Sequence, residues 1–388
     1  MLMGNSSHCV RTHSALSIPL NWNGSGNGRI VCVGYRFWKR KNVTPFLSLF
    51  SERVRFVPNV RIAEGMKLSR NDCLVHWGCD VPRELEALSQ HTGARLLRME
   101  DGFVRSVGLG SNLVRPLSLV LDQRGIYFDP AQPSDLEYIL NTVQFPAEEL
   151  ERARKVRAFI ASYKITKYNI DPHGMAAWGD RPEEIVLVPG QVEDDASILH
   201  GCQDTQTNLG LLQAVRQAHP RAFIVYKPHP DVMAGNRPGK LELAQAMEYA
   251  DHVELHLSVV SCIEACDVVH TMTSLTGFDA LLRGKQVVTH GQPFYAGWGL
   301  TEDMAQGGIA FLRRKRRLTL DELVCGALLR YPVYWDWELK GYTTCEAVLQ
   351  RIVEMRCKLE VCGGLEKPGM GYVRQQTRKL GILARSWL

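Results

Sequence analysis

The sequence contains no hydrophobic run long enough to cross a membrane and no pair of cysteines with metal-binding spacing. A membrane-spanning helix needs about 20 consecutive apolar residues, and no run in this 388-residue chain approaches that length. The eleven cysteines are scattered singly, without a CxxC pair. This scatter argues against a zinc site and indicates reduced thiols in a cytoplasm.

Several common nucleotide-binding and nucleophile motifs are missing as well. The chain has no P-loop and no GxSxG elbow, which excludes the usual NTPase and α/β-hydrolase sites. Gly24, Gly26 and Gly28 imitate a dinucleotide-binding loop, but no strand precedes them. They belong to a polar segment, 1–28, that lacks the apolar core of a signal peptide. We expect this segment to be a disordered extension.

The composition is that of a globular protein with a slight excess of positive charge. With 45% hydrophobic and 22% charged residues, the 388-residue chain can form two domains of ordinary size. The net charge of +5 suits an anionic substrate or an anionic membrane surface. It does not require a nucleic-acid partner, and we expect none.

Short apolar runs alternate with helical patterns, which predicts an α/β fold with two Rossmann-like halves facing a cleft. The first half, 29–165, has expected strands at 30–34, 74–77, 96–99 and 117–121. The second half, 166–312, has expected strands at 185–188, 222–226, 252–255, 267–270 and 286–289. We expect parallel sheets with helices on both faces, and a basic helical region and tail over 313–388.

Acidic residues follow the first strand of the second half. Pro189 and Gly190 end that strand, and Gln191, Asp194 and Asp195 come next, before an expected helix. Ligands of α/β proteins bind at the carboxyl ends of parallel strands, so a carboxylate here can act as a nucleophile or a base. Capping of the helix by Asp194 or Asp195 is the ordinary structural alternative.

A matching acidic pair, Glu100 and Asp101, follows the strand expected at 96–99 in the first half. Gly102 allows close approach of a ligand, and the two carboxylates could supply a general acid or base. The alternative is a structural ion pair between one of them and Arg105.

Two further segments favour phosphate binding. Lys227 and His229 follow the strand at 222–226, where prolines hold the backbone and the side chains could contact a phosphate. Thr273 and Ser274 precede a helix at 278–283, whose positive end would attract an anion. The alternatives are a strand-ending turn and simple helix capping.

Together these segments resemble the bacterial capsule-biosynthesis β-Kdo transferases of the KpsC/LipA type, most closely their C-terminal module. The resemblance extends over about residues 31–334. Family members typically carry two such modules, whereas this chain carries one. The matching stretches are EDGFVRSVGLGS (100–111), PLSLVLDQRGIYFD (116–129), KYN (167–169), VPGQVEDDASI (188–198), YKPHPDV (226–232), HTMTSLTGFDALLRGK (270–285) and PFYAGWGLTED (293–303).

The resemblance implies a GT-B-like glycosyltransferase that transfers Kdo from CMP-Kdo with retention. The implied acceptor is a Kdo-terminated (lyso)phosphatidylglycerol linker on which a capsule chain is built. It also implies a cytoplasmic enzyme, peripheral at the inner membrane, that could contact other capsule assembly proteins. No DxD-type motif stands out near the site residues, so we expect neither a metal nor a cofactor besides the donor substrate.

The family motifs assign roles to individual residues. The QxxxD pattern falls on Gln191 and Asp195, which makes Asp195 the expected nucleophile, with Asp194 as the competing candidate. Glu100 and Asp101 match the acidic pair. The expected donor-binding residues are Gln191, Lys227, His229, Pro230, Thr273 and Ser274. The expected acceptor-side and loop residues are Arg105, Lys167, Tyr168, Asn169, Tyr295 and Trp298.

Two other functions fit the same motifs. A sialyltransferase-like enzyme would bind its CMP-sugar through similar residues, and a non-catalytic capsule-assembly module would need only the binding groups.

The five basic residues at 313–317 and the basic tail suggest contact of the protein with an anionic inner leaflet. The alternative is an ordinary solvated surface.

Overall fold

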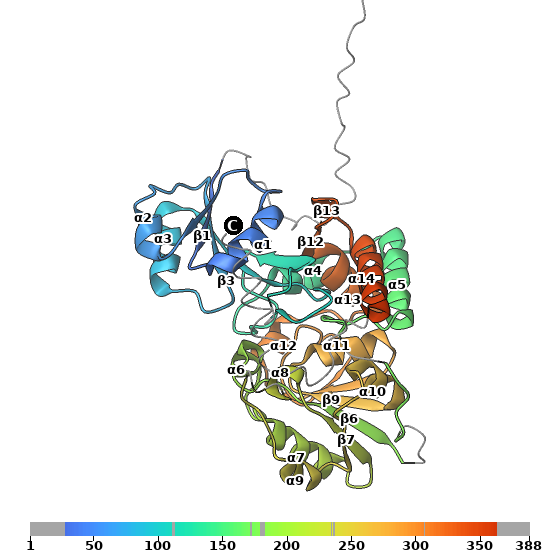
Figure 1. The fold of residues 1–388 in the computed structure, drawn as a ribbon. Helices are drawn as coiled ribbons and strands as arrows, with labels where there is room; N and C mark the ends of the chain where they lie inside the picture. The colour runs from blue at the N-terminus through green and yellow to red at the C-terminus, as the bar shows by residue number, and fades with distance from the viewer. Residues whose placement is uncertain are drawn as a thin grey trace, which may run out of the picture.

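The computed structural model describes residues 28–110, 113–170, 173–178, 183–233, 235, 237–305 and 307–362. Figure 1 shows two α/β halves stacked on one another, each built around its own sheet. The α/β architecture predicted from the sequence is therefore confirmed. The extension predicted over 1–28, except for Gly28, and the tail beyond 362 lie outside the described residues.

The first sheet has seven strands in the order β13-β12-β5-β4-β3-β1-β2. Four parallel strands come from the start of the chain: β1 (Ile30–Val33), β2 (Val54–Val57), β3 (Cys73–Trp77) and β4 (Arg95–Asp101). The helices that pack beside them are α1 (Phe37–Leu47), α2 (Val60–Glu64) and α3 (Arg83–Thr92). The apolar residues of β1 alternate between the two faces, so Ile30 and Cys32 pack toward α1 while Val31 and Val33 pack toward α2 and α3.

The prediction of an entirely parallel sheet is wrong for this half. β5 (Ser118–Asp122) runs antiparallel to β4, and β12 (Pro332–Asp336) and β13 (Gly341–Thr343) continue the antiparallel edge. The C-terminal segment expected to be only helical thus completes the first sheet. Around this edge lie α4 (Asp135–Thr142), α5 (Ala147–Ser162), α13 (Leu320–Val324), the π-helix η2 (Cys325–Arg330) and α14 (Cys345–Val361), with α14 beside α5 (Figure 1).

The second sheet has six parallel strands in the order β11-β10-β9-β6-β7-β8. Their bounds are β6 (Ile185–Pro189), β7 (Phe223–Lys227), β8 (His252–Val253), β9 (Val268–Thr271), β10 (Gln286–Thr289) and β11 (Glu302–Asp303). This is the strand order of a doubly wound nucleotide-binding fold, and its direction reverses between β6 and β9. Ligands of such sheets bind at the carboxyl ends of the strands that flank the reversal.

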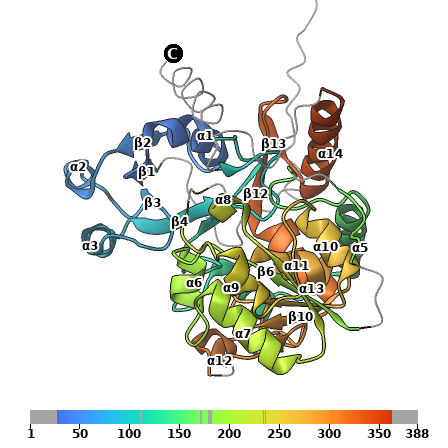
Figure 2. The same ribbon diagram turned by 60° about the horizontal axis from the view of Figure 1, so that its bottom comes forward.

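Helices cover both faces of the second sheet, as Figure 2 shows. Val186 and Val188 of β6 pack with α7 (Asn208–Ala218) and α9 (Leu243–Met247), whereas Ile185 and Leu187 pack with α10 (Val259–Ala265) and α11 (Leu275–Leu282). Three other short helices belong to this half: α6 (Ala196–Gly201), α8 (Pro230–Met233) and α12 (Ile309–Arg313).

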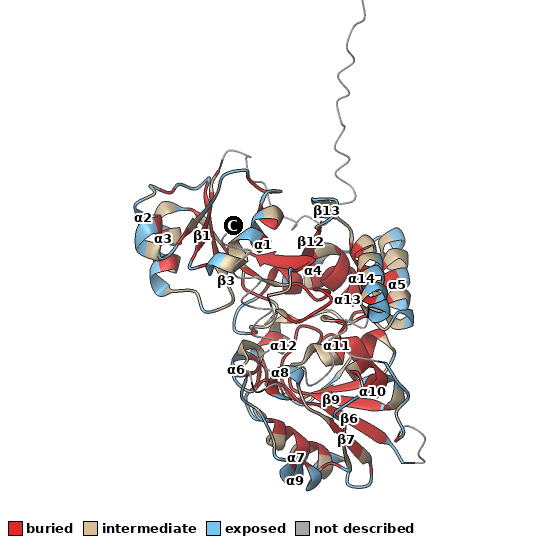
Figure 3. Ribbon diagram, in the orientation of Figure 1, coloured by how far each residue is buried: buried red, intermediate tan, exposed pale blue. Residues whose placement is uncertain are grey.

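A continuous aromatic core joins the two halves, and buried residues run through both sheets and the region between them (Figure 3). Phe103 of the first half lies against Phe294 of the second, with ring centroids 4.4 Å apart, and Tyr127 and Phe278 surround this pair. Because apolar area from both sheets is buried here, the halves are held in a defined relative position.

The basic run at 313–317 is largely used inside the protein. Arg313 pairs with Glu137, buried Arg314 donates to two backbone carbonyl oxygens, and Arg316 pairs with Glu322. Within the run, only the side chains of Lys315 and Arg317 are exposed. The prediction that the whole run forms a membrane-binding surface is therefore wrong. Within the described part of the chain, no helix is both long and apolar enough to span a membrane.

Candidate active site

A cavity of about 770 Å³ lies between the two halves, at the carboxyl ends of β4, β6 and β9. Most of the residues predicted from the sequence line it: Glu100, Asp101, Arg105, Lys167, Tyr168, Gln191, Asp195, His229, Thr273 and Ser274. The fold therefore brings together motifs that lie far apart in the sequence. Both acidic stretches face this one cavity, as expected for two opposed halves.

The side chain of Gln191 ties the end of β6 to the start of α11. Its Oε1 accepts hydrogen bonds from the backbone N–H groups of Thr273 (3.0 Å) and Ser274 (3.1 Å), and from the hydroxyl of Thr271 (3.2 Å). Its Nε2 donates to Oγ1 of Thr273 (3.1 Å). The backbone N–H groups of Thr273 and Ser274, which precede α11, are therefore bound by Gln191 and are not free for an anion. Ser274 also acts as the N-cap, because its Oγ accepts from Thr276 N.

Asp195 ends a directed chain of hydrogen bonds. Thr273 Oγ1 donates to Ser197 Oγ (3.2 Å), and Ser197 Oγ donates to Oδ1 of Asp195 (2.7 Å). Ser197 N also donates to Oδ1 (3.0 Å), so Asp195 is the N-cap of α6. Asp195 therefore caps a helix and lines the cavity at the same time. Donors aligned in one direction strengthen each other and fix the carboxylate.

Asp194 does not line the cavity. Its side chain is exposed and accepts two hydrogen bonds at Oδ1 from Arg237, at 2.6 and 3.0 Å. Arg237 itself lines the cavity. The structure thus separates the adjacent acids: Asp195 faces the cavity, and Asp194 positions a cation at its edge.

Glu100 and Asp101 are the last two residues of β4 rather than residues that follow it. Asp101 Oδ2 accepts from Nε of buried Arg105 (2.6 Å), which confirms the structural ion pair considered for Arg105. Asp101 Oδ1 is buried and has no hydrogen-bond partner among the described residues. Burial and the neighbouring Asp101 carboxylate raise the pKa of Glu100 to about 7. Glu100 is therefore the carboxyl group suited to take up or release a proton near neutral pH.

The segment Lys167-Tyr168-Asn169 crosses back to hold the loop that follows β4. The carbonyl of Lys167 accepts from the N–H groups of Arg105 and Ser106, both at 3.2 Å. Asn169 is buried, has a left-handed backbone (φ 55°) and donates through Nδ2 to Ser106 O (2.9 Å). Asn169 thus supports the loop instead of lining the cavity. Burial by itself would lower the pKa of Lys167. The neighbouring Tyr127, Tyr168, Asp101 and Glu100 outweigh this effect and raise the pKa of Lys167, which keeps it a cation.

His229 lines the cavity with a defined tautomer. Its Nδ1 accepts from the N–H of Asp231 (3.2 Å), so the proton of the neutral ring is on Nε2. Burial lowers the pKa of His229, which favours this neutral form. Lys227 is the last residue of β7 and Pro230 begins α8; neither lines the cavity.

Tyr295 and Trp298 are core residues rather than cavity residues. Both are buried, and Tyr295 Oη donates to the carbonyl of Ser274 (2.5 Å), while Trp298 Nε1 donates to the carbonyl of Phe294 (2.8 Å). Tyr295 therefore supports the start of α11 from behind. The motif that contains them is rich in aromatic residues, and these residues build the core between the halves.

Several residues that line the cavity were not predicted from the sequence, and Lys39 and Ser197 are the most informative of them. Lys39 of α1 places its Nζ 3.3 Å from the ring centroid of Trp77, and burial lowers its pKa to about 8. A signal was available, because α1 follows β1 at the strand-order reversal of the first sheet. Ser197 lies two residues after Asp195, in the position from which a hydroxyl reaches a capping carboxylate.

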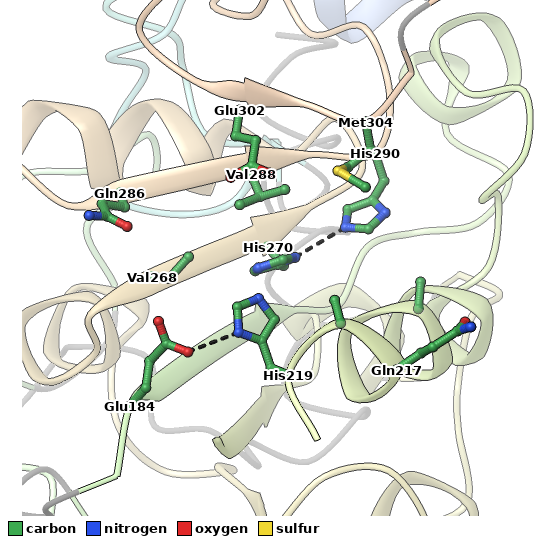
Figure 4. Close-up of a pocket in the computed structure, with 12 residues that line it drawn as sticks. Glu184, Gln217, His219, Val268, His270, Gln286, Val288, His290, Glu302 and Met304 are labelled. Carbon is green, nitrogen blue, oxygen red and sulfur yellow. Dashed lines mark hydrogen bonds and ion pairs between the residues drawn. The ribbon is translucent and has the colours of Figure 1, made fainter. Parts of the chain in front are cut away.

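A second cavity, of about 570 Å³, lies along β9, β10 and β11 beside α7 (Figure 4). His270 and His290 hydrogen-bond through their rings at 3.2 Å, and His219 pairs with Glu184 at 2.8 Å. None of the residues predicted from the sequence lines this cavity. The cavity between the halves is therefore the candidate active site.

The chain matches the family described as capsule polysaccharide biosynthesis protein over residues 72–179 and 161–334. It belongs to this family. The capsule polysaccharide modification protein LipA of Neisseria meningitidis serogroup B is 41% identical over 365 residues, covering 94% of this chain and 51% of LipA. The chain thus spans about half the length of this curated relative.

Two solved structures from Thermosulfurimonas dismutans are also similar, and both are described as KpsC transferases. The β-Kdo 2,7 transferase shares 34% identity with a TM-score of 0.69, covering 84% of this chain and 99% of that one. The β-Kdo 2,4 transferase shares 32% identity with a TM-score of 0.72, covering 83% and 97%. The predicted KpsC/LipA relationship is confirmed.

Titration of Glu100 tests the electrostatics of this site. We expect the ¹³C-labelled Glu100 carboxyl to titrate near pH 7, well above its ordinary value of 4.5, and Asp101→Asn to lower this pKa by removing the adjacent charge. Because the folded state holds this proton more tightly, the stability contribution of Glu100 is lost as the pH rises from 4.5 through about 7. Carboxyl NMR on the full chain measures the value. Titration of Glu100 at its ordinary pH would contradict the described burial.

Proposed function

We propose that this chain is a retaining β-Kdo transferase of GT-B-like architecture, which transfers Kdo from CMP-Kdo to a Kdo-terminated, lipid-linked acceptor. The observation that carries the proposal is the fixed carboxylate of Asp195 facing the same cavity as Glu100, from the opposite half. The two similar KpsC structures, described as β-Kdo transferases, support the same chemistry.

The donor occupies the second half in this proposal. The cavity reaches the strand-order reversal between β6 and β9, where nucleotides bind in such sheets. His229 would donate from Nε2 to a phosphate oxygen, and Arg237 and Lys167 would balance the negative charges of the CMP phosphate and the Kdo carboxylate. The start of α11 contributes its dipole beside Ser274, although Gln191 binds the N–H groups of Thr273 and Ser274 that precede the helix.

The first chemical step is attack by Asp195 on the anomeric carbon of Kdo. A bond forms between a carboxylate oxygen and that carbon, and the bond from the carbon to the phosphate oxygen breaks. CMP leaves with the electron pair. Ser197 donates two hydrogen bonds to Oδ1 of Asp195, which orient the carboxylate and leave it negatively charged for the attack. The product is a sugar covalently bound to Asp195, with inverted configuration at the anomeric carbon.

The second step restores the configuration. A hydroxyl of the acceptor attacks the same carbon from the opposite face, its proton passes to the Glu100 carboxylate, and Asp195 is released. A pKa near 7 lets Glu100 accept this proton and return it to solvent at neutral pH. Asp101, which is paired with Arg105, lies beside Glu100 and adds to the effect of burial in raising the pKa of Glu100.

In this reaction the leaving phosphate is neutralised by side chains, so no metal or further cofactor is needed. The lipid-linked acceptor would bring the enzyme to the cytoplasmic face of the inner membrane as a peripheral protein, close to other capsule assembly proteins. Lys315 and Arg317 remain exposed for contact with anionic lipid.

Asp195→Asn should abolish transfer, because an amide of the same shape is a poor nucleophile. We expect a loss in kcat on the order of 10⁴-fold, the scale of losing a catalytic nucleophile. Asp194→Asn is the matched control: it weakens an exposed ion pair worth about 0.2–1 kcal/mol, so activity should stay within roughly five-fold.

The assay combines CMP-Kdo with a synthetic Kdo-terminated acceptor, and NMR of the product reports the linkage. CMP-sialic acid as a competing donor separates Kdo transfer from a sialyltransferase activity. Full turnover by Asp195→Asn, or loss of turnover only in Asp194→Asn, would contradict the assigned nucleophile. Donor binding without any turnover by the unaltered chain would instead indicate a non-catalytic module.

Ser197→Ala tests the positioning of Asp195. Removing a hydrogen bond to a charged group costs about 1.5–3 kcal/mol, which corresponds to a decrease of roughly 10–100-fold in kcat. The KM for CMP-Kdo should change little, because Ser197 is assigned no donor contact. Ser197→Thr keeps the hydroxyl and should restore most of the rate. Equal loss in both variants would show that the hydroxyl does not act through Asp195.

A further inference from the structure

Outside the lining of the main cavity, a cysteine, an aspartate and a histidine from different halves converge. Cys79 and Asp80 follow β3 in the first half, and His200 lies on α6 in the second. One ligand atom from each of the three lies within 4.8 Å of the other two. We infer that Cys79, Asp80 and His200 form a zinc site that joins the two halves beside the cavity.

Two of the three ligand separations are close to the edges of a tetrahedral zinc site, and the third, between Cys79 Sγ and a ring nitrogen of His200, is within 4.8 Å. Cys79 Sγ lies 3.7 Å from Asp80 Oδ1, and His200 Nε2 lies 3.5 Å from the same oxygen. Zinc bonds of about 2.3 Å to sulfur and about 2.0 Å to nitrogen or oxygen put tetrahedral ligands roughly 3.3–3.6 Å apart. The three atoms can therefore bind one ion after only small movements, with water as the fourth ligand.

The donor types select zinc among the biological divalent cations. A thiolate and an imidazole together disfavour Mg²⁺ and Ca²⁺, which prefer oxygen ligands, and suit Zn²⁺. Zinc binding would release the thiol proton of Cys79 to solvent, so the thiolate, the carboxylate and the neutral imidazole would balance the charge of the ion.

Asp129 lies close to where the outer contact of a zinc-bound histidine usually forms, although its distance to His200 is longer than a hydrogen bond. Its Oδ1 lies 3.9 Å from Nδ1 of His200, on the ring edge opposite Nε2. Metal-bound histidines typically donate their second N–H to a carboxylate, which fixes the tautomer and the ring orientation. Asp129 is itself held, since Oδ1 accepts from Ala131 N (2.9 Å).

The location gives the site a structural role. None of the three ligands lines the cavity, but their close neighbours in sequence, Trp77 and Asp195, do. A zinc ion here would cross-link the loop after β3 to α6, the helix that Asp195 caps. It would fix the separation of the two halves at the cavity without taking part in the transfer.

Zinc binding to the full chain tests this inference. After chelator treatment and dialysis, the protein is titrated with Zn²⁺ alone by calorimetry, and with Co²⁺ to detect a thiolate-to-cobalt charge-transfer band. We expect one ion per chain, the cobalt band, and a higher Tm with zinc because the ion binds only the folded state. Cys79→Ser and His200→Asn should each abolish stoichiometric uptake. Asp129→Asn should weaken binding about 10–100-fold.

The matched control removes the exposed cysteines of the C-terminal helix end, Cys357→Ser with Cys362→Ser. This double variant should bind zinc as the unaltered chain does. Failure of the unaltered chain to take up one zinc, or to show the cobalt band, would overturn the inference. Retention of zinc by both ligand variants, or its loss in the control, would do the same. If a ligand variant does not fold, the cobalt spectra of the unaltered chain and the control decide.

Discussion

The side-chain amide of Gln191 is the interaction on which the candidate active site depends. It joins the ends of β6 and β9, which are neighbours in the sheet although Gln191 and its partner Thr273 are 82 residues apart in the sequence. Because Gln191 Nε2 donates to the hydroxyl of Thr273, this hydroxyl donates its own proton to Ser197, and Ser197 in turn donates to Asp195. Any side chain that could not both accept and donate would break this chain of hydrogen bonds.

The first half reaches a similar result with charge instead of an amide. Arg105 binds Asp101 and, together with the backbone of Lys167, fixes the loop after β4. Glu100 lies beside Asp101, and burial together with the Asp101 carboxylate raises the pKa of Glu100 to about 7. The two halves thus present different carboxyl groups to the cavity. Asp195 is fixed by the hydroxyl of Ser197, whereas burial and a neighbouring like charge raise the pKa of Glu100.

Much of this arrangement could be predicted from local sequence, because it depends on strand ends. The apolar run that forms β6 and the break at Pro189 placed Gln191 and Asp195 correctly, and the family motifs brought Thr273 and His229 to the same cavity. What could not be predicted depends on distant partners. Arg313 is neutralised by Glu137, 176 residues away, so the basic run looked like a free surface in the sequence.

The antiparallel edge of the first sheet escaped prediction for a related reason. A short strand such as β12 carries no sign of which sheet it joins, and only its pairing with β5 shows that the chain returns to the first half. Tyr295 and Trp298 belong to a conspicuous motif, yet they build the core, because their large aromatic side chains fill the space where the two halves pack together.

The most direct test of the account is the mass of the protein after mixing with CMP-Kdo in the absence of acceptor. Rapid denaturation and intact-mass spectrometry should find one Kdo residue added per chain, with CMP released in equal amount and the sugar on the peptide that contains Asp195. The adduct should disappear on addition of acceptor and be absent from Asp195→Asn. Transfer at full rate by a chain that never carries the sugar, or carries it on another residue, would contradict the account.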